Sequence, residues 1–194
     1  MTSAFPQAPK RTTAVQSGPA AVQIGELTLG TPVMLAPMAG VTNPPFRQLC
    51  REFGEQAMHD AQAKGDVRER PGSYAPTGLY VCEMITSRAL IERTPETMRM
   101  IEPDMGDPVR SIQLYGVAPA AIRESVRLLV GNGWADHIDL NFGCPVPKVT
   151  RKGGGSALPW KHDLFADIVA AAVEAALSDE QRHGATEALR DACD

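Results

Sequence analysis

One segment in the last third of the chain concentrates the side chains that could do chemistry. It runs from Asp139 to Leu158 and reads DLNFGCPVPKVTRKGGGSAL. Within it, Cys144 stands between Gly143 and Pro145, which predicts a tight and defined turn. A thiol held in this way can serve as an acid or a nucleophile, or it can be a small buried apolar group. The residues alone leave these roles open.

Basic residues and glycines follow Cys144 in the same segment. Lys148, Arg151 and Lys152 form a local cationic cluster in a chain whose formal net charge is −4. A substrate that carries phosphates would suit this cluster. The glycine run at 153–155 could bind a phosphate through its backbone amides, or it could be a flexible loop.

The remaining cysteines and the four histidines give no comparable signal. We interpret Cys50 and Cys82 as buried apolar residues, and Cys193, in a polar tail, as an incidental thiol. The cysteines form no CxxC or CxxH pair, so we predict neither a metal site nor a disulfide framework. The histidines lack the spacing of a catalytic triad or a ligand set and are interpreted as surface or supporting residues.

The composition is that of an ordinary globular protein. Of the 194 residues, 43% are hydrophobic and 22% are charged, which excludes a disordered or collagen-like chain. The apolar stretches fall far short of the roughly 20 residues that span a bilayer, and residues 1–23 contain no apolar signal-peptide core. We therefore predict a cytoplasmic protein with no membrane contact. Its acidic balance gives no general attraction to nucleic acid, so RNA would have to bind the local basic cluster.

The elements that position Cys144 alternate between strands and helices. Apolar runs predict strands at 33–36, 79–82, 110–115 and 137–141, and helical periodicity predicts helices at 43–53, 119–131 and 164–177. A short hairpin is predicted at 22–29. The first helix is expected to carry one apolar face, formed by Phe46, Leu49, Cys50 and Phe53. Strands that alternate with helices indicate parallel strands joined by right-handed crossovers.

Such alternation fits either an open doubly wound sheet or part of a (βα)8 barrel. The turn after the first strand, PMAGVT at 37–42, lacks the GxGxxG phosphate turn of a dinucleotide-binding sheet. Side chains that could take part in binding or catalysis also stand at the ends of all four strands. They are Met38, Glu83, Gln113, and Asn141 with Cys144. Glu83 could be a base or a hydrogen-bonded strand-end carboxylate. A barrel places its active site at these strand ends but needs about 250 residues. We therefore predict an α/β fold of the (βα)8 TIM-barrel type with only the first four βα units.

Four motifs in order resemble those of the tRNA-dihydrouridine synthases, and most of all the bacterial B-type branch. They are LAPMAGVTNPPFR at 35–47, YVCEMITSRAL at 80–90, SIQLYG at 111–116 and the Cys144 segment at 139–158. The similarity continues to about residue 177. It implies a flavin-dependent barrel followed by a helical domain, and the reduction of uridine in tRNA to 5,6-dihydrouridine with FMN and NADPH.

The resemblance also implies roles for single residues. Pro37, Met38 and Ala39 would lie against FMN, and Gln113 would hydrogen-bond the flavin ring. Cys144 would give a proton to C5 of uracil while the reduced flavin delivers hydride to C6. Hydride addition leaves negative charge at C5 and the C4 carbonyl, so a positioned acid is needed. An ordinary thiol, with a reference pKa of about 8.5, is mostly protonated at neutral pH.

On the substrate side, the resemblance places Asn141 near the base and makes Lys148, Arg151 and Lys152 contacts to tRNA phosphates. The tRNA is thus the expected partner.

The sequence departs from this family in two places. A polar insertion at 55–77 separates the first helix from the second strand and is expected to be solvated, away from the site. After residue 177 the family would continue into a fifth strand with a flavin-binding lysine, whereas residues 178–194 read as a divergent helical tail. We thus predict a disordered leader at 1–20, the N-terminal half of a flavin-binding barrel at 21–177, and this tail.

Half a barrel leaves its first and fourth strands as unpaired edges, so self-association through these edges is expected. Two alternatives to an active synthase stay open. One is a truncated, catalytically inactive remnant of the same family. The other is a related flavin barrel such as a dihydroorotate dehydrogenase, in which a cysteine before proline also follows an Asn-containing strand.

Overall fold

The computed structural model describes residues 22–65, 76–102 and 106–177. The predicted leader at 1–20 and the predicted tail at 178–194 lie outside the described residues, as does the middle of the predicted insertion, residues 66–75.

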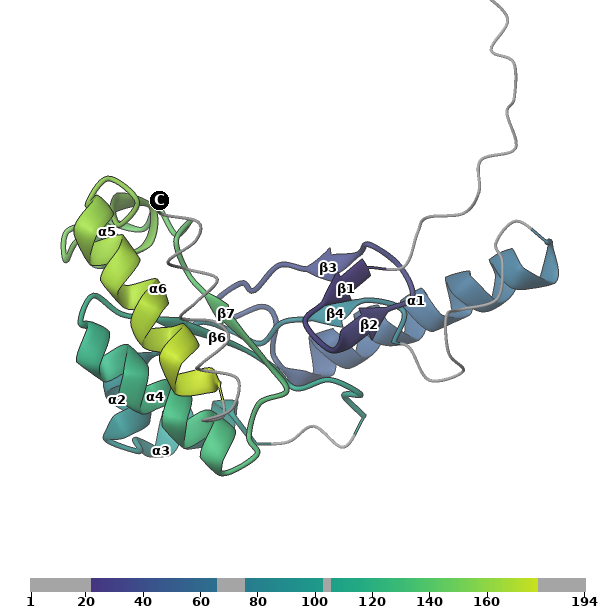
Figure 1. Ribbon diagram of the computed structural model, residues 1–194. Coiled ribbons are helices and arrows are strands. Elements are labelled where there is room, and N and C mark those ends of the chain that lie inside the picture. Colours follow the sequence, from purple (N-terminus) through teal and green to yellow (C-terminus); the bar gives the residue numbers. More distant parts are fainter. Residues whose placement is uncertain (1–21, 66–75, 103–105, 178–194) are drawn as a thin grey trace, which may run out of the picture.

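The described chain opens with a hairpin and then alternates strands and helices (Figure 1). The elements are β1 (Val22–Ile24), β2 (Leu27–Leu29), β3 (Met34–Leu35), α1 (Pro44–Ala63), β4 (Leu79–Tyr80), β5 (Ile85–Thr86), α2 (Ser87–Ile91), α3 (Pro95–Met100), β6 (Ser111–Tyr115), α4 (Pro119–Gly131), β7 (His137–Leu140), α5 (Pro147–Thr150), the 3-10 turn η1 (Gly155–Ala157) and α6 (His162–Ala176). Within the described residues, each predicted strand and helix is present, with bounds that differ by at most two residues except at the end of α1.

The parallel strands lie side by side in the order of the chain. β3 pairs with β4, and β5, β6 and β7 form a second parallel group. Val81, just after β4, bridges to Ser111 of β6 and links the two groups. Sequential order is the arrangement of a (βα)8 barrel, whereas a doubly wound sheet reverses direction at a switch point. The barrel is not closed in the described residues, where β3 and β7 each have a single strand neighbour.

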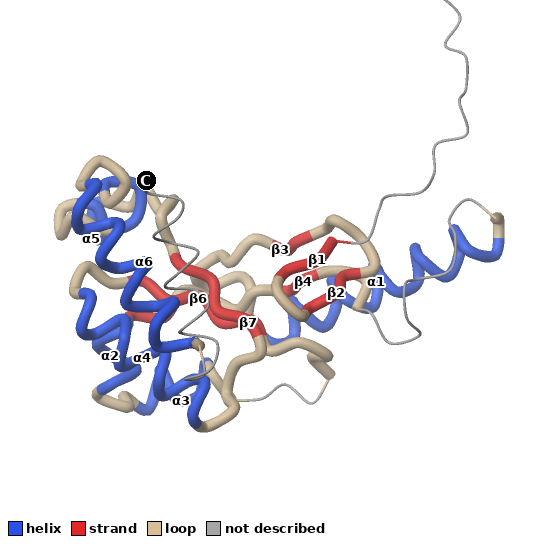
Figure 2. The backbone as a smooth tube through the Cα atoms, in the orientation of Figure 1, coloured by secondary structure: helices blue, strands red, loops and turns tan. Residues whose placement is uncertain are grey.

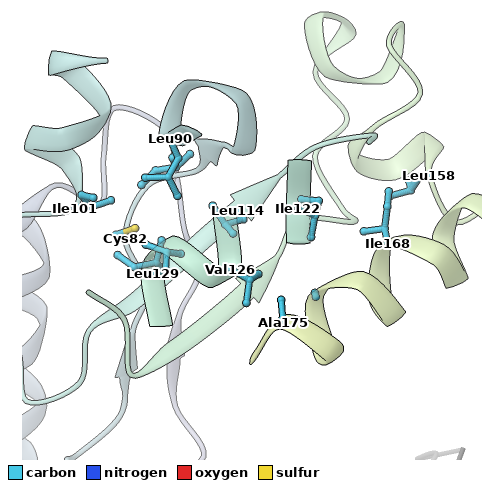
Figure 3. Close-up of a cluster of buried hydrophobic side chains, with 13 residues drawn as sticks. Cys82, Leu90, Ile101, Leu114, Ile122, Val126, Leu129, Leu158, Ile168 and Ala175 are labelled. Carbon is cyan, nitrogen blue, oxygen red and sulfur yellow. The ribbon is translucent and has the colours of Figure 1, made fainter. Parts of the chain in front are cut away.

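Helices α2, α3, α4 and α6 gather on the same side of β6 and β7, while the hairpin and α1 lie toward the other end of the molecule (Figure 2). The main core fills the space between these helices and the strands (Figure 3). Leu114 of β6 is fully buried there against Ile122 and Leu129 of α4, and Ile168 brings α6 into the same cluster. The apolar periodicity of α4 and α6 thus fixes their position on the sheet.

The hairpin covers a second, smaller core. Leu29 of β2 packs with Leu79 and Val81, and Val109 joins them from the segment before β6. Gly25 makes the turn between β1 and β2 possible because its φ is +57°. The hairpin therefore covers the apolar side chains of Leu79, Val81 and Val109.

Helix α1 begins where the sequence predicts, but it ends at Ala63, ten residues beyond the predicted end. The Asn43 side chain accepts a hydrogen bond from the Phe46 amide at 3.1 Å and caps its start. The helix passes through Gly54 and ends at Ala63, so the first part of the predicted insertion is helical. Gly54 is needed there because a Cβ at this position would meet the Tyr80 hydroxyl.

The predicted apolar face of α1 is wrong. Leu49 and Phe53 are 48% and 68% exposed. The buried residues of α1 are instead Met58 and two arginines, Arg47 and Arg51, which both pair with the buried carboxylate of Asp107. Hydrophobic periodicity could not show this because the buried stripe is held by ion pairs rather than by apolar contact.

Candidate functional site

A pocket of about 550 Å³ opens at the carboxyl ends of the strands. Its lining comes from the turn after β3, the segment after β4, β6, and β7 with its following loop. The lining residues are Pro37, Met38, Ala39, Met84, Gln113, Leu140, Asn141, Phe142, Gly143, Cys144, Pro145 and Val146. The structure therefore brings together six sequence-predicted residues: Pro37, Met38, Ala39, Gln113, Asn141 and Cys144.

The backbone of Cys144 is held on both sides. Its amide donates to the side-chain oxygen of Asn141 at 2.9 Å, and its carbonyl accepts from the Ser156 amide at 3.0 Å. Gly155 packs directly beneath, with φ +54°, and a Cβ there would overlap the Cys144 carbonyl oxygen. The half-buried thiol-bearing loop is thus clamped between the end of β7 and the glycine run.

The glycine run supports this loop rather than offering a phosphate cradle. The amides of Gly153 and Gly154 donate to the carbonyls of Thr150 and Val149 at 2.8 and 3.2 Å. All three glycines are buried. Because these amides are already used inside the protein, neither the phosphate-binding nor the flexible-loop interpretation of the run fits the structure.

Polar side chains on one face of β6 and β7 connect to Cys144. Gln113 and Asp139 are partners in the strand register, and the Gln113 amide nitrogen donates to the Asp139 carboxylate at 2.5 Å. The Asn141 amide nitrogen donates to the Gln113 side-chain oxygen at 3.2 Å and to the Met84 sulfur at 2.9 Å. Both polar atoms of the Asn141 side chain therefore hydrogen-bond to the protein itself, although Asn141 lines the pocket.

Sequence reasoning missed Asp139 and Met84. The signal for Asp139 was present, since it stands two residues before Asn141 in the same predicted strand. Alternate residues of a strand share a face, so Asp139 had to point to the same side as Asn141.

Glu83 lies outside the pocket lining. Its carboxylate accepts a hydrogen bond from the Gly40 amide at 2.5 Å. In the same turn, the Met38 amide donates to the Thr42 hydroxyl at 3.0 Å. Glu83 is thus a hydrogen-bonded strand-end carboxylate that fixes the turn carrying Pro37 to Ala39.

The basic cluster is exposed and does not line the pocket. Lys148 lies in the short helix α5, and Arg151 and Lys152 lie in the turn that follows it. Trp160, which sequence reasoning passed over, is 85% exposed just before the next lysine, Lys161. This stretch is therefore a basic surface with one projecting aromatic ring beside the pocket loop.

Cys82 and His137, both close to the strands, have shifted pKa values. Burial raises the pKa of the Cys82 thiol to about 11, which fits its predicted role as an apolar residue. Burial also lowers the pKa of His137, whose ring nitrogen lies 2.8 Å from the Ser111 hydroxyl. In the part of the chain that is described, no group of three or more His, Cys, Asp or Glu side chains could hold a metal ion, and no helix is long and apolar enough to cross a bilayer.

Parallel strands that alternate with helices, with a cysteine loop at their carboxyl ends, define an α/β protein. A sequence profile described as "Dihydrouridine synthase (Dus)" matches residues 34–182. The chain belongs to this dihydrouridine synthase family.

Individual relatives agree with the family match. A probable tRNA-dihydrouridine synthase of Mycobacterium tuberculosis is 52% identical over 165 residues, which is 85% of this chain and 38% of the relative. The probable tRNA-dihydrouridine synthase of Mycobacterium leprae is 51% identical over 146 residues, which is 73% of this chain and 38% of the relative. The tRNA-dihydrouridine synthase B of Pseudomonas aeruginosa is 38% identical over 79% of this chain and 40% of its own. The chain thus spans about two-fifths of the length of these curated relatives.

Proposed function

We propose that this chain carries the catalytic cysteine and part of the flavin site of an FMN-dependent tRNA-dihydrouridine synthase, which reduces uridine in tRNA to 5,6-dihydrouridine with NADPH in the cytoplasm. The observation that carries the proposal is the single pocket in which Met38, Gln113, Asn141 and Cys144 meet. These residues come from three separate strand ends.

The pocket suits the ring of FMN better than its phosphate. Apolar groups of Pro37, Met38 and Ala39 form one wall, and the Gln113 side-chain N–H that Asp139 does not take can donate to a ring acceptor. No lysine or arginine stands among the described residues that line it, so the phosphate would bind elsewhere. Bound FMN would supply the hydride for C6 of the uracil ring.

Cys144 would supply the proton. Addition at C6 leaves negative charge that an acid at C5 must neutralise. The two backbone hydrogen bonds of Cys144, together with the close packing of Gly155, hold the thiol at the pocket without relying on its own side chain. Its position is therefore set before any ligand binds.

Lys148, Arg151 and Lys152 would bind tRNA phosphates. They are exposed beside the Cys144 loop and outside the pocket, which separates phosphate binding from base chemistry. Contacts of this kind weaken steeply as salt rises.

The competing proposal is an inactive remnant of the family. It is favoured by the open sheet, since β3 and β7 each have only one strand neighbour in the described chain. These edges would also let the chain associate with a second copy.

Incubation of the full chain with FMN, NADPH and unmodified tRNA tests the proposed activity, with dihydrouridine measured by mass spectrometry of the digested tRNA. An active synthase gives dihydrouridine that is lost in Cys144→Ala. Product absent from the wild-type reaction, with salt-sensitive tRNA binding retained, would support the remnant instead.

A further inference from the structure

A continuous line of hydrogen bonds runs from the Cys144 loop to Asp139. The amides of Cys144 and Gly143 donate to the Asn141 side-chain oxygen at 2.9 and 3.2 Å. The Asn141 amide nitrogen donates to Gln113 at 3.2 Å, and the Gln113 amide nitrogen donates to Asp139 at 2.5 Å. The side chains of Asn141 and Gln113 thus link the loop to the carboxylate of Asp139 on the sheet.

The two ends of this line fix its direction. Backbone amides can only donate, so the oxygen of Asn141 must face the loop and its nitrogen must face Gln113. The oxygen of Gln113 then accepts from Asn141, which turns its nitrogen toward Asp139. An ionised carboxylate can only accept, so the far end requires the same orientation.

We propose that Asp139 is a positioning residue that holds the Gln113 amide in one orientation and, through Asn141, holds the loop that presents Cys144. One N–H of Gln113 is taken by Asp139, and the other has no acceptor among the described residues. Because Gln113 lines the pocket, the orientation set by Asp139 leaves one N–H donor of Gln113 for a ligand. This inference rests on the proposed function only in treating Cys144 as the reacting acid.

The test follows the thiol of Cys144 in the full chain without flavin. Iodoacetamide is added at neutral pH, and the alkylation rate of each cysteine is measured by peptide mass spectrometry. Asp139→Leu removes the acceptor and should raise the Cys144 rate about tenfold, the effect of losing one ordinary hydrogen bond that keeps the loop closed. Asp139→Asn keeps an oxygen that can accept from Gln113 and should stay close to the wild-type rate.

Two controls separate positioning from general loosening. Asp136→Asn changes a carboxylate just before the same strand, bound to Arg110 rather than to the pocket, and should leave the Cys144 rate unchanged. Cys82, which is 3% exposed, reports on the fold in every variant. A rise at Cys144 without a rise at Cys82 supports positioning, whereas an equal rise at both overturns it.

A double variant tests whether the residues act along one line. Asn141→Leu should raise the Cys144 rate by itself, and adding Asp139→Leu should then change little, because the connection is already broken. Additive effects of the two substitutions, or an unchanged rate in Asp139→Leu, would refute the inference. Failure to bind FMN or to reduce tRNA would contradict the proposed function but would leave these thiol measurements unaffected.

Discussion

At the scale of single residues, the site depends on backbone geometry as much as on side-chain chemistry. Cys144 is placed by an asparagine on one side and by a glycine run on the other. Catalytic groups held by such fixed contacts lose little entropy when a substrate binds. Residues that touch no ligand should therefore affect the reaction through the Cys144 loop.

Replacement of the thiol tests its proposed chemical role. Cys144→Ala should lower the rate of tRNA reduction by about 10²- to 10⁴-fold, the usual contribution of a positioned acid. FMN binding, followed by flavin absorbance, should change little because the loop backbone remains. An unchanged reduction rate would show that another group protonates C5.

Gly155 offers a sharper test of the loop. Gly155→Ala places a Cβ against the Cys144 carbonyl at a positive φ and should cost about 1–3 kcal/mol of unfolding free energy. Gly131→Ala is the matched control, since no atom lies within 4 Å of its Cβ. Urea unfolding measures both variants, and equal stabilities would argue against the clamp.

At the scale of elements, local sequence patterns predict where strands and helices begin but not always what they contact. The proline and asparagine at 43–45 mark the start of α1, whereas Gly54 suggests an end that does not occur. Its lack of a side chain serves a close approach to Tyr80, not a helix end. Likewise, β6 and β7 are predictable from their apolar runs, but the pairing of Gln113 with Asp139 depends on a register that only the fold sets.

The buried ion pairs of α1 should stabilise its position strongly. Asp107→Asn leaves Arg47 and Arg51 buried without a full countercharge and should lower the unfolding free energy by about 3–5 kcal/mol. Glu92→Gln, which breaks the exposed pair with Arg88, should cost less than about 1 kcal/mol. Urea unfolding compares the two, and similar small losses would show that Asp107 does not anchor the helix.

Stability should also fall in mild acid because of His137 in β7. Burial lowers its pKa in the folded chain, so the unfolded chain takes up a proton more readily once the pH drops below about 6.5. The unfolding free energy should then decrease from pH 7.5 to 5.5, by at most about 1.4 kcal/mol per unit of pH. His137→Gln should flatten this dependence; an equally steep decrease in that variant would assign it to other groups.

At the scale of the whole molecule, the open sheet edges predict self-association. Met34 of β3 is 50% exposed at one edge, and a lysine there should oppose strand pairing between copies. Size exclusion with light scattering should show concentration-dependent association that Met34→Lys reduces. Val130→Lys, on the exposed surface of α4, is the control and should not change it. Equal behaviour of the two variants would place the contact elsewhere.

The proposed function requires that the pocket of Cys144 and Gln113 binds a flavin. The most direct test is the visible absorption spectrum of the purified chain before and after addition of FMN, recorded across a size-exclusion peak. We expect flavin bands that elute with the protein and weaken in Gln113→Leu. Protein that elutes folded and free of flavin, even with excess FMN, would contradict it.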